Sequence, residues 1–93
     1  MSAGDAAPER SLIDYPSAFP IKVMGARADG LTEAVVALAL QFDATFDAAT
    51  LEARPSKGGK YLGLTITVNA TSREQLDALY RALSAHPMVK VVL

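Results

Sequence analysis

The stretch "YLGLTITVNATSREQLDALYRAL", residues 61–83, predicts a strand that leads directly into a helix. In its first part, aliphatic side chains alternate with small or polar ones, which is the period of a strand with one buried face. "TSRE", residues 71–74, then predicts a capping box, in which Thr71 accepts a hydrogen bond from the Glu74 amide and the Glu74 carboxylate reaches back. We expect the helix to end near Ala85. The aliphatic strand positions are Leu62, Leu64, Ile66 and Val68, and the apolar stripe of the helix is Leu76, Leu79, Tyr80 and Leu83.

Another strand and helix precede this stretch. Residues 19–26 alternate apolar and other side chains, and residues 29–42 place apolar side chains at helical spacing. We expect Asp29 to cap the opening amides of this helix. Residues 46–55 predict an edge strand with a bulge or a frayed start near Ala48 and Ala49, and Pro55 favours the edge position.

The C-terminal segment predicts a last strand. Pro87 cannot continue the helix before it, and "MVKVVL", residues 88–93, alternates in the manner of a strand. We expect Val89, Val91 and Leu93 on one side and Lys90 on the other.

These elements predict an α+β fold of the ferredoxin-like type. The order is βαββαβ, which right-handed crossovers fold into a four-stranded antiparallel sheet with both helices on one face. The first and third strands should lie in the centre. We expect one domain over residues 15–93 and a tail over residues 1–14. Candidates for the sheet face without helices are Lys22, Met24, Glu52, Arg54, Tyr61, Thr65, Thr67, Lys90 and Val92.

Composition narrows the possible function classes. The chain has 93 residues, 51% of them hydrophobic, and no cysteine, which excludes a thiolate nucleophile and a cysteine-ligated metal. Its net charge of −1 gives no overall attraction for nucleic acid or an anionic bilayer. No apolar run reaches the length of about 20 residues that a membrane helix needs, and the start lacks a signal-peptide pattern. We expect a cytoplasmic protein.

"RPSKGGKYLG", residues 54–63, looks most like a functional site. A phosphate loop needs a different spacing between a strand and a helix, and an RNA-recognition domain needs more aromatic residues than Tyr61. A hairpin turn explains Gly58 and Gly59, which supply positive backbone angles. The alternative is an anion or acidic-partner contact through Arg54, Lys57, Lys60 and Tyr61.

"GARADG", residues 25–30, is a second candidate site. A small carboxylate or phosphate ligand at Gly25, Asp29 and Gly30 would benefit from the helix amides. The simpler interpretation is that Asp29 itself occupies those amides as a cap.

The sequence offers no catalytic constellation. His86 is the only histidine, so we expect no metal site, and no serine has a histidine and an acid at a recognisable spacing. We also expect no cofactor. We therefore expect a protein that is not an enzyme.

"YPSAFPIKVMG" (15–25), residues 54–83 and "MVKVVL" together resemble the YbeD-like family of small proteobacterial proteins, also called lipoate regulatory proteins. That family is similar in fold to ACT regulatory domains, which bind amino acids. The resemblance implies a regulatory module that senses a small carboxylate metabolite or binds a partner enzyme, with a link to lipoate metabolism. The alternative function is RNA binding through the open sheet face and the basic hairpin, although nucleic acid is not the expected partner. We expect a monomer or weak homodimer.

Overall fold

The structure is a computed structural model, which describes residues 14–93 of the chain. The predicted tail, residues 1–14, lies outside the described residues apart from Asp14. In chain order the elements are β1 (Ser17–Ala26), α2 (Leu31–Phe42), the 3₁₀ turn η1 (Ala48–Thr50), β2 (Glu52–Pro55), β3 (Tyr61–Ala70), α3 (Arg73–Ala85) and β4 (Val89–Val92). The predicted βαββαβ order is confirmed.

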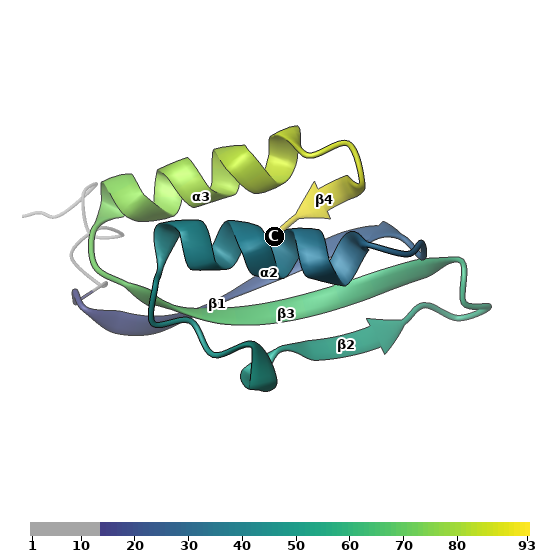
Figure 1. The fold of residues 1–93 in the computed structure, drawn as a ribbon, viewed down its shortest axis with the longest axis horizontal. Helices are drawn as coiled ribbons and strands as arrows, with labels where there is room; N and C mark the ends of the chain where they lie inside the picture. Colours follow the sequence, from purple (N-terminus) through teal and green to yellow (C-terminus); the bar gives the residue numbers. More distant parts are fainter. Residues whose placement is uncertain (1–13) are drawn as a thin grey trace, which may run out of the picture.

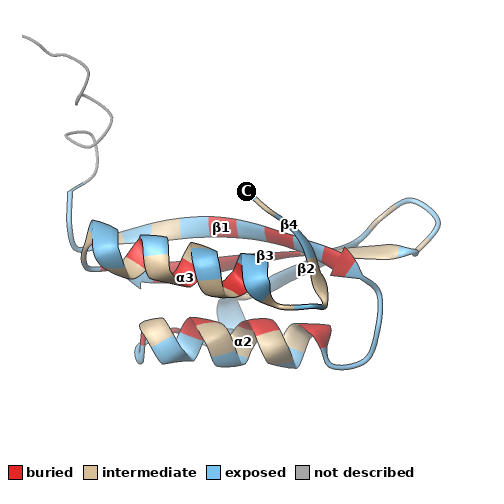
Figure 2. Ribbon diagram, turned by 90° about the horizontal axis from the view of Figure 1, so that it is seen from above, coloured by how far each residue is buried: buried red, intermediate tan, exposed pale blue. Residues whose placement is uncertain are grey.

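The four strands form one antiparallel sheet in the order β2-β3-β1-β4. As predicted, β1 and β3 lie in the centre, and they pair over their full length, from Ser17 opposite Ala70 to Ala26 opposite Tyr61. Both helices pack on one face of the sheet (Figure 1). The other face has no helix over it within residues 14–93 (Figure 2).

The core lies between the sheet and the helices. Its side chains come from alternate positions of the central strands and from one stripe of each helix, as the periodicities predict. The largest fully buried side chains are Ile21, Val23, Leu31, Val35, Leu64, Ile66, Val68, Leu79 and Leu83.

The start of α2 differs from the prediction. Gly30, with φ of 93°, is the N-cap residue, and no side chain accepts a capping hydrogen bond there. The expectation that Asp29 caps α2 is wrong. A glycine can adopt the left-handed backbone angle that this turn requires, so the chain enters the helix through backbone geometry.

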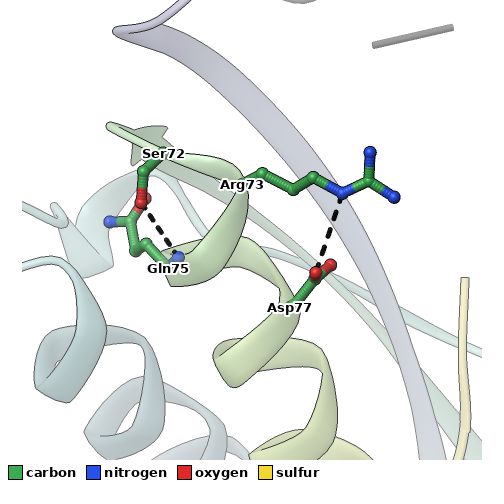
Figure 3. A network of polar contacts seen from close by, with 4 residues as sticks. All are labelled: Ser72, Arg73, Gln75 and Asp77. Carbon is green, nitrogen blue, oxygen red and sulfur yellow. Dashed lines mark hydrogen bonds and ion pairs between the residues drawn. The ribbon is translucent and has the colours of Figure 1, made fainter. Parts of the chain in front are cut away.

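The start of α3 is capped one residue later than predicted. Ser72 Oγ accepts a hydrogen bond from the Gln75 amide at 3.0 Å (Figure 3). Gln75 Oε1 in turn accepts from the Thr71 amide at 2.7 Å. The two orphan donors are therefore satisfied by Ser72 and Gln75, and the assignment to Thr71 and Glu74 is wrong.

The segment before the hairpin contains less strand than predicted. Phe46 is buried in the core, and Asp47 accepts a hydrogen bond from the Ala49 amide at 2.9 Å to open η1. Only Glu52–Pro55 pairs with β3. The edge position is confirmed, but the predicted extent of 46–55 is wrong, because the Asp47 side chain stabilises a turn instead of a strand.

The side of β4 that meets the helices also differs from the prediction. Val92 pairs with Val23 and Val91 with Met24, after which the register shifts at Met24/Gly25. Paired residues point to the same face, so Val92 packs against the core and Val91 lies on the open face. Val89 packs against the core as expected. The prediction for Val91 and Val92 is wrong, because the irregularity shifts the alternation by one residue between Val89 and Val91.

One buried carboxylate links the end of α2 to β3. Asp43 is 6% exposed and accepts hydrogen bonds from the Asn69 amide at 2.8 Å, the Thr45 amide at 2.9 Å and the Thr45 hydroxyl. Burial raises the pKa of Asp43, but the bonds from Thr45 and Asn69 outweigh burial, so the pKa lies below its ordinary value. Asp43 is thus a charged structural bridge whose acceptor oxygens are occupied.

Candidate functional site

The open face of the sheet carries a hollow of about 730 Å³. It crosses the middle of the sheet and is lined by side chains from every strand. The period of two explains this, because the even positions of β1 and the odd positions of β3 that are not in the core face this side. Its lining includes Lys22, Met24, Glu52, Arg54, Pro55, Ser56, Gly63, Thr65, Val91 and Leu93.

Small residues form the floor of the hollow and apolar ones form one wall. Gly63 and Thr65 of β3 leave space above the backbone, because neither carries a large side chain. Met24, Val91 and Leu93 stand beside them and are exposed by 43%, 45% and 72%. Leu93 is held at this edge by two backbone hydrogen bonds with Lys22, at 2.7 and 3.2 Å. The side chains of this wall present an apolar surface to whatever enters the hollow.

Three charged side chains also line the hollow, namely Lys22, Glu52 and Arg54. Arg54 pairs in register with Gly63, while Thr65 lies between its two register partners, Lys22 on β1 and Glu52 on β2. The charged side chains around the small floor are therefore two cations and one carboxylate. This arrangement suits a molecule that has an apolar body and an anionic group.

The stretch 54–63 forms the predicted hairpin. Ser56 donates its amide to the Tyr61 carbonyl at 2.9 Å, and its hydroxyl accepts from the Tyr61 amide at 3.0 Å. The Gly59 amide donates to the Ser56 carbonyl at 2.8 Å. Gly58 and Gly59 have φ of 91° and 75°, which confirms the predicted role of the glycines. The tip, residues 56–60, is thus fixed by its own hydrogen bonds.

The structure divides the predicted cation site into two parts. Arg54 lines the hollow, whereas Lys57 and Lys60 lie at the hairpin tip. Lys60 Nζ lies 5.8 Å from the centre of the Tyr61 ring, which is half-buried. Whether these four residues contact a partner stays a prediction.

Arg27 joins the tip, although no pattern in the sequence singled it out. Its amide donates to the Lys60 carbonyl at 3.0 Å. A methyl group placed on Gly59 would come 3.1 Å from Arg27 Nη1, so the guanidinium lies over this glycine. The contact brings the two candidate stretches, 25–30 and 54–63, together. No local pattern could have predicted it, since the partners are more than thirty residues apart in the chain.

The turn at residues 25–30 shows a structural reason for Gly25. A methyl group there would come 2.3 Å from the Met88 carbonyl oxygen and 3.1 Å from the Leu31 side chain. Asp29 and Gly30 are exposed. A ligand at Gly25, Asp29 and Gly30 stays a prediction, but packing already explains the first glycine.

His86 is the C-cap residue of α3 and forms hydrogen bonds with neighbouring residues of its own chain. Its amide donates to the Leu83 carbonyl at 3.2 Å, and its Nδ1 accepts from the Met88 amide at 3.1 Å. Within residues 14–93 there is no group of three or more His, Cys, Asp or Glu side chains arranged to hold a metal ion. Neither helix of this part of the chain has the length and apolar character to cross a membrane.

A solved structure supports the fold. The solution structure of protein HP0495 from H. pylori superposes with a TM-score of 0.72, at 20% identity, over 87% of this chain and 85% of that one. This likeness confirms the small α+β arrangement of four strands and two helices.

Sequence comparisons give the family. Residues 10–93 match the family described as "Protein of unknown function (DUF493)". The UPF0250 protein of Leptothrix cholodnii is 69% identical over 85 residues, which are 91% of this chain and 93% of the relative. The UPF0250 protein RSc0326 of Ralstonia nicotianae is 66% identical over 86 residues, 92% of this chain and 89% of the relative. The YbeD-like resemblance agrees with these matches, and the chain belongs to the DUF493 family, together with relatives that carry the name UPF0250.

Proposed function

We propose that this protein is a cytoplasmic, non-catalytic regulatory module that binds a small carboxylate-bearing metabolite in the hollow of its open sheet face. The observation that carries the proposal is the hollow itself, which combines an apolar wall, a small floor and two cations. Its volume of about 730 Å³ is in the range of pockets that hold small molecules, roughly 300–1,000 Å³.

The charges favour an anionic group on the ligand. Arg54 and Lys22 both line the hollow, and within residues 14–93 neither has a carboxylate partner within 4.0 Å, since the ion pair there joins Arg73 to Asp77. A guanidinium offers paired donors that match the two oxygens of a carboxylate. Glu52 disfavours a ligand with several negative charges, so one carboxylate fits better than a polyphosphate.

The apolar wall favours a hydrocarbon body next to that carboxylate. Met24, Val91 and Leu93 are exposed in the free protein, and covering them would contribute about 25 cal/mol per Å² of apolar surface. The resemblance to lipoate regulatory proteins adds lipoate and octanoate to the candidates, beside amino acids. A bound ligand would change the surface that a partner enzyme meets, which is how a module of this size can regulate.

A thermal-unfolding screen tests the proposal. Amino acids, lipoate and octanoate are added at up to about 10 mM, and a ligand present at ten times its Kd should add about 1.4 kcal/mol, or several degrees in Tm. The Arg54→Ala variant should lose most of this shift, whereas Arg81→Ala, which removes an exposed arginine on α3, should keep it. The uncharged carboxamide derivative of an active ligand should give no shift in Tm. If no carboxylate raises Tm, or if Arg54→Ala responds like the unmodified protein, the proposal is wrong.

A further inference from the structure

We infer that the cationic tip, defined as Arg27, Lys57 and Lys60, is a docking surface for an acidic segment of another protein. It is a surface separate from the hollow and goes beyond the proposed ligand site. The β1–α2 loop and the hairpin project at the same end of the sheet (Figure 1), and the Arg27–Lys60 backbone bond holds them together.

The three tip cations form no ion pair with a carboxylate of the described chain. In residues 14–93 the ion pair within 4.0 Å is Arg73–Asp77 on α3, so the three tip cations have no carboxylate at that distance. All three residues are exposed. The chain as a whole has a net charge of −1, so this concentration of positive charge runs against the overall balance. Charges of this kind attract a partner of opposite sign and orient it.

The tip is also a rigid support. Ser56 binds Tyr61 through both its amide and its hydroxyl, and the two glycines close the turn at positive φ. Arg27 Nη1 lies next to this turn, since a methyl group on Gly59 would come 3.1 Å from it. The backbone that carries the cations is therefore ordered before a partner arrives, which lowers the part of the entropic cost of binding that comes from the loop.

The surroundings favour a protein segment over nucleic acid. Base stacking needs exposed rings, and Tyr61 at the tip is half-buried with Lys60 beside it. Beyond Tyr61 the same face continues into the hollow, where Glu52 would repel a phosphate backbone and the apolar wall would go unused. A short acidic protein segment can contact the three tip cations without crossing the hollow.

A peptide titration tests the surface. The probe is a fluorescein-labelled peptide of six Ser-Glu repeats, with six Ser-Gln repeats as the uncharged control, measured by fluorescence anisotropy on the full chain. We expect the acidic peptide to saturate below about 1 mM at low salt and to weaken as salt screens the charges. Lys57→Ala/Lys60→Ala should weaken binding about fivefold or more, and Arg27→Ala should weaken it in the same direction.

The matched control is Arg73→Ala/Arg81→Ala, which removes the same charge from exposed positions on α3. It should change the affinity less than twofold. Equal losses in the two double variants, or no saturation by the acidic peptide, would overturn the inference. The inference would also be overturned, in favour of nucleic acid, if a labelled oligo-dT bound more tightly than the acidic peptide and lost this binding in Lys57→Ala/Lys60→Ala. Arg54→Ala keeps all three tip cations, so the proposal for the hollow and the inference for the tip can be tested independently.

Discussion

Gly25 lies where β1 passes the Met88 carbonyl oxygen, and this contact leaves no room for a side chain. A methyl group would come 2.3 Å from that oxygen, so backbone must move before alanine fits. We predict that Gly25→Ala lowers the free energy of unfolding by about 1–3 kcal/mol, measured by urea denaturation.

Gly63 is the matched control for Gly25 on the neighbouring strand. A methyl group there would come 3.5 Å from the Arg54 carbonyl oxygen, which is ordinary van der Waals contact. Gly63→Ala should change stability by only about 0.5 kcal/mol. Equal stability of the two variants would show that Gly25 does not approach the Met88 carbonyl as closely as the structure describes.

Asp43 should make stability depend on acid pH. The pKa of Asp43 is lower in the folded state than the unfolded value of about 3.9. Asp43 therefore contributes to the free energy of unfolding above about pH 3.9, and this contribution is lost as pH falls through the folded pKa. We predict that Asp43→Asn costs about 1–3 kcal/mol at pH 7, because the charge-assisted bonds to Asn69 and Thr45 are weakened. Urea titrations at several pH values should show the gap between variant and unmodified protein narrowing below pH 4. A gap that stays constant with pH would contradict the charged bridge.

At the scale of elements, α3 depends on its cap. Ser72 supplies the hydroxyl that accepts from Gln75, whereas Thr71 takes part through its backbone amide. We predict that Ser72→Ala costs about 1 kcal/mol and Thr71→Ala about 0.5 kcal/mol or less. Thermal unfolding of both variants decides the register of the cap, since the reverse ranking would place it at Thr71.

The irregularity between β1 and β4 makes a second prediction at this scale. Val92 packs against the core and Val91 is exposed on the open face. Val92→Ser should therefore cost about 1 kcal/mol, and Val91→Ser should stay within about 0.5 kcal/mol. If Val91→Ser is the more damaging change in chemical denaturation, then Val91 and not Val92 packs against the core, and the pairing of Val92 with Val23 is incorrect.

The elements with a long, uninterrupted period could be predicted from the sequence. β3, α2 and α3 each repeat their apolar positions often enough to determine both the type of element and its buried face. Their order then led to the sheet topology through the handedness of the crossovers.

The errors occurred where a single side chain or backbone contact decides the structure. Alternation in residues 46–55 is compatible with a strand, but the Asp47 carboxylate stabilises a turn in part of it. The facing of β4 changed because of an irregularity that arises from pairing with β1. Arg27 was missed because its contact with the hairpin depends on the whole fold. The charges of the hairpin were visible in the sequence, whereas the hollow emerges only when four strands are side by side.

At the scale of the whole fold, residues 14–93, the helix-free face and the hairpin end are surfaces whose features the packing of the core does not explain. The helices and the core explain the fold, and the turn explains the glycines at the tip. The hollow and the cations remain as features that a solvent-exposed sheet does not need. Our central claim is that the hollow binds a carboxylate with an apolar body.

The most direct test is a titration of the ¹⁵N-labelled full chain with octanoate, followed by amide chemical shifts. We predict saturable changes centred on Met24, Gly63, Thr65 and Val91, with Arg54→Ala abolishing them and Arg81→Ala leaving them intact. Changes confined to residues 25–30 would place the ligand at the β1–α2 turn, and changes confined to 56–60 would place it at the hairpin tip. Either of these results, or no saturable change at all, would contradict the claim.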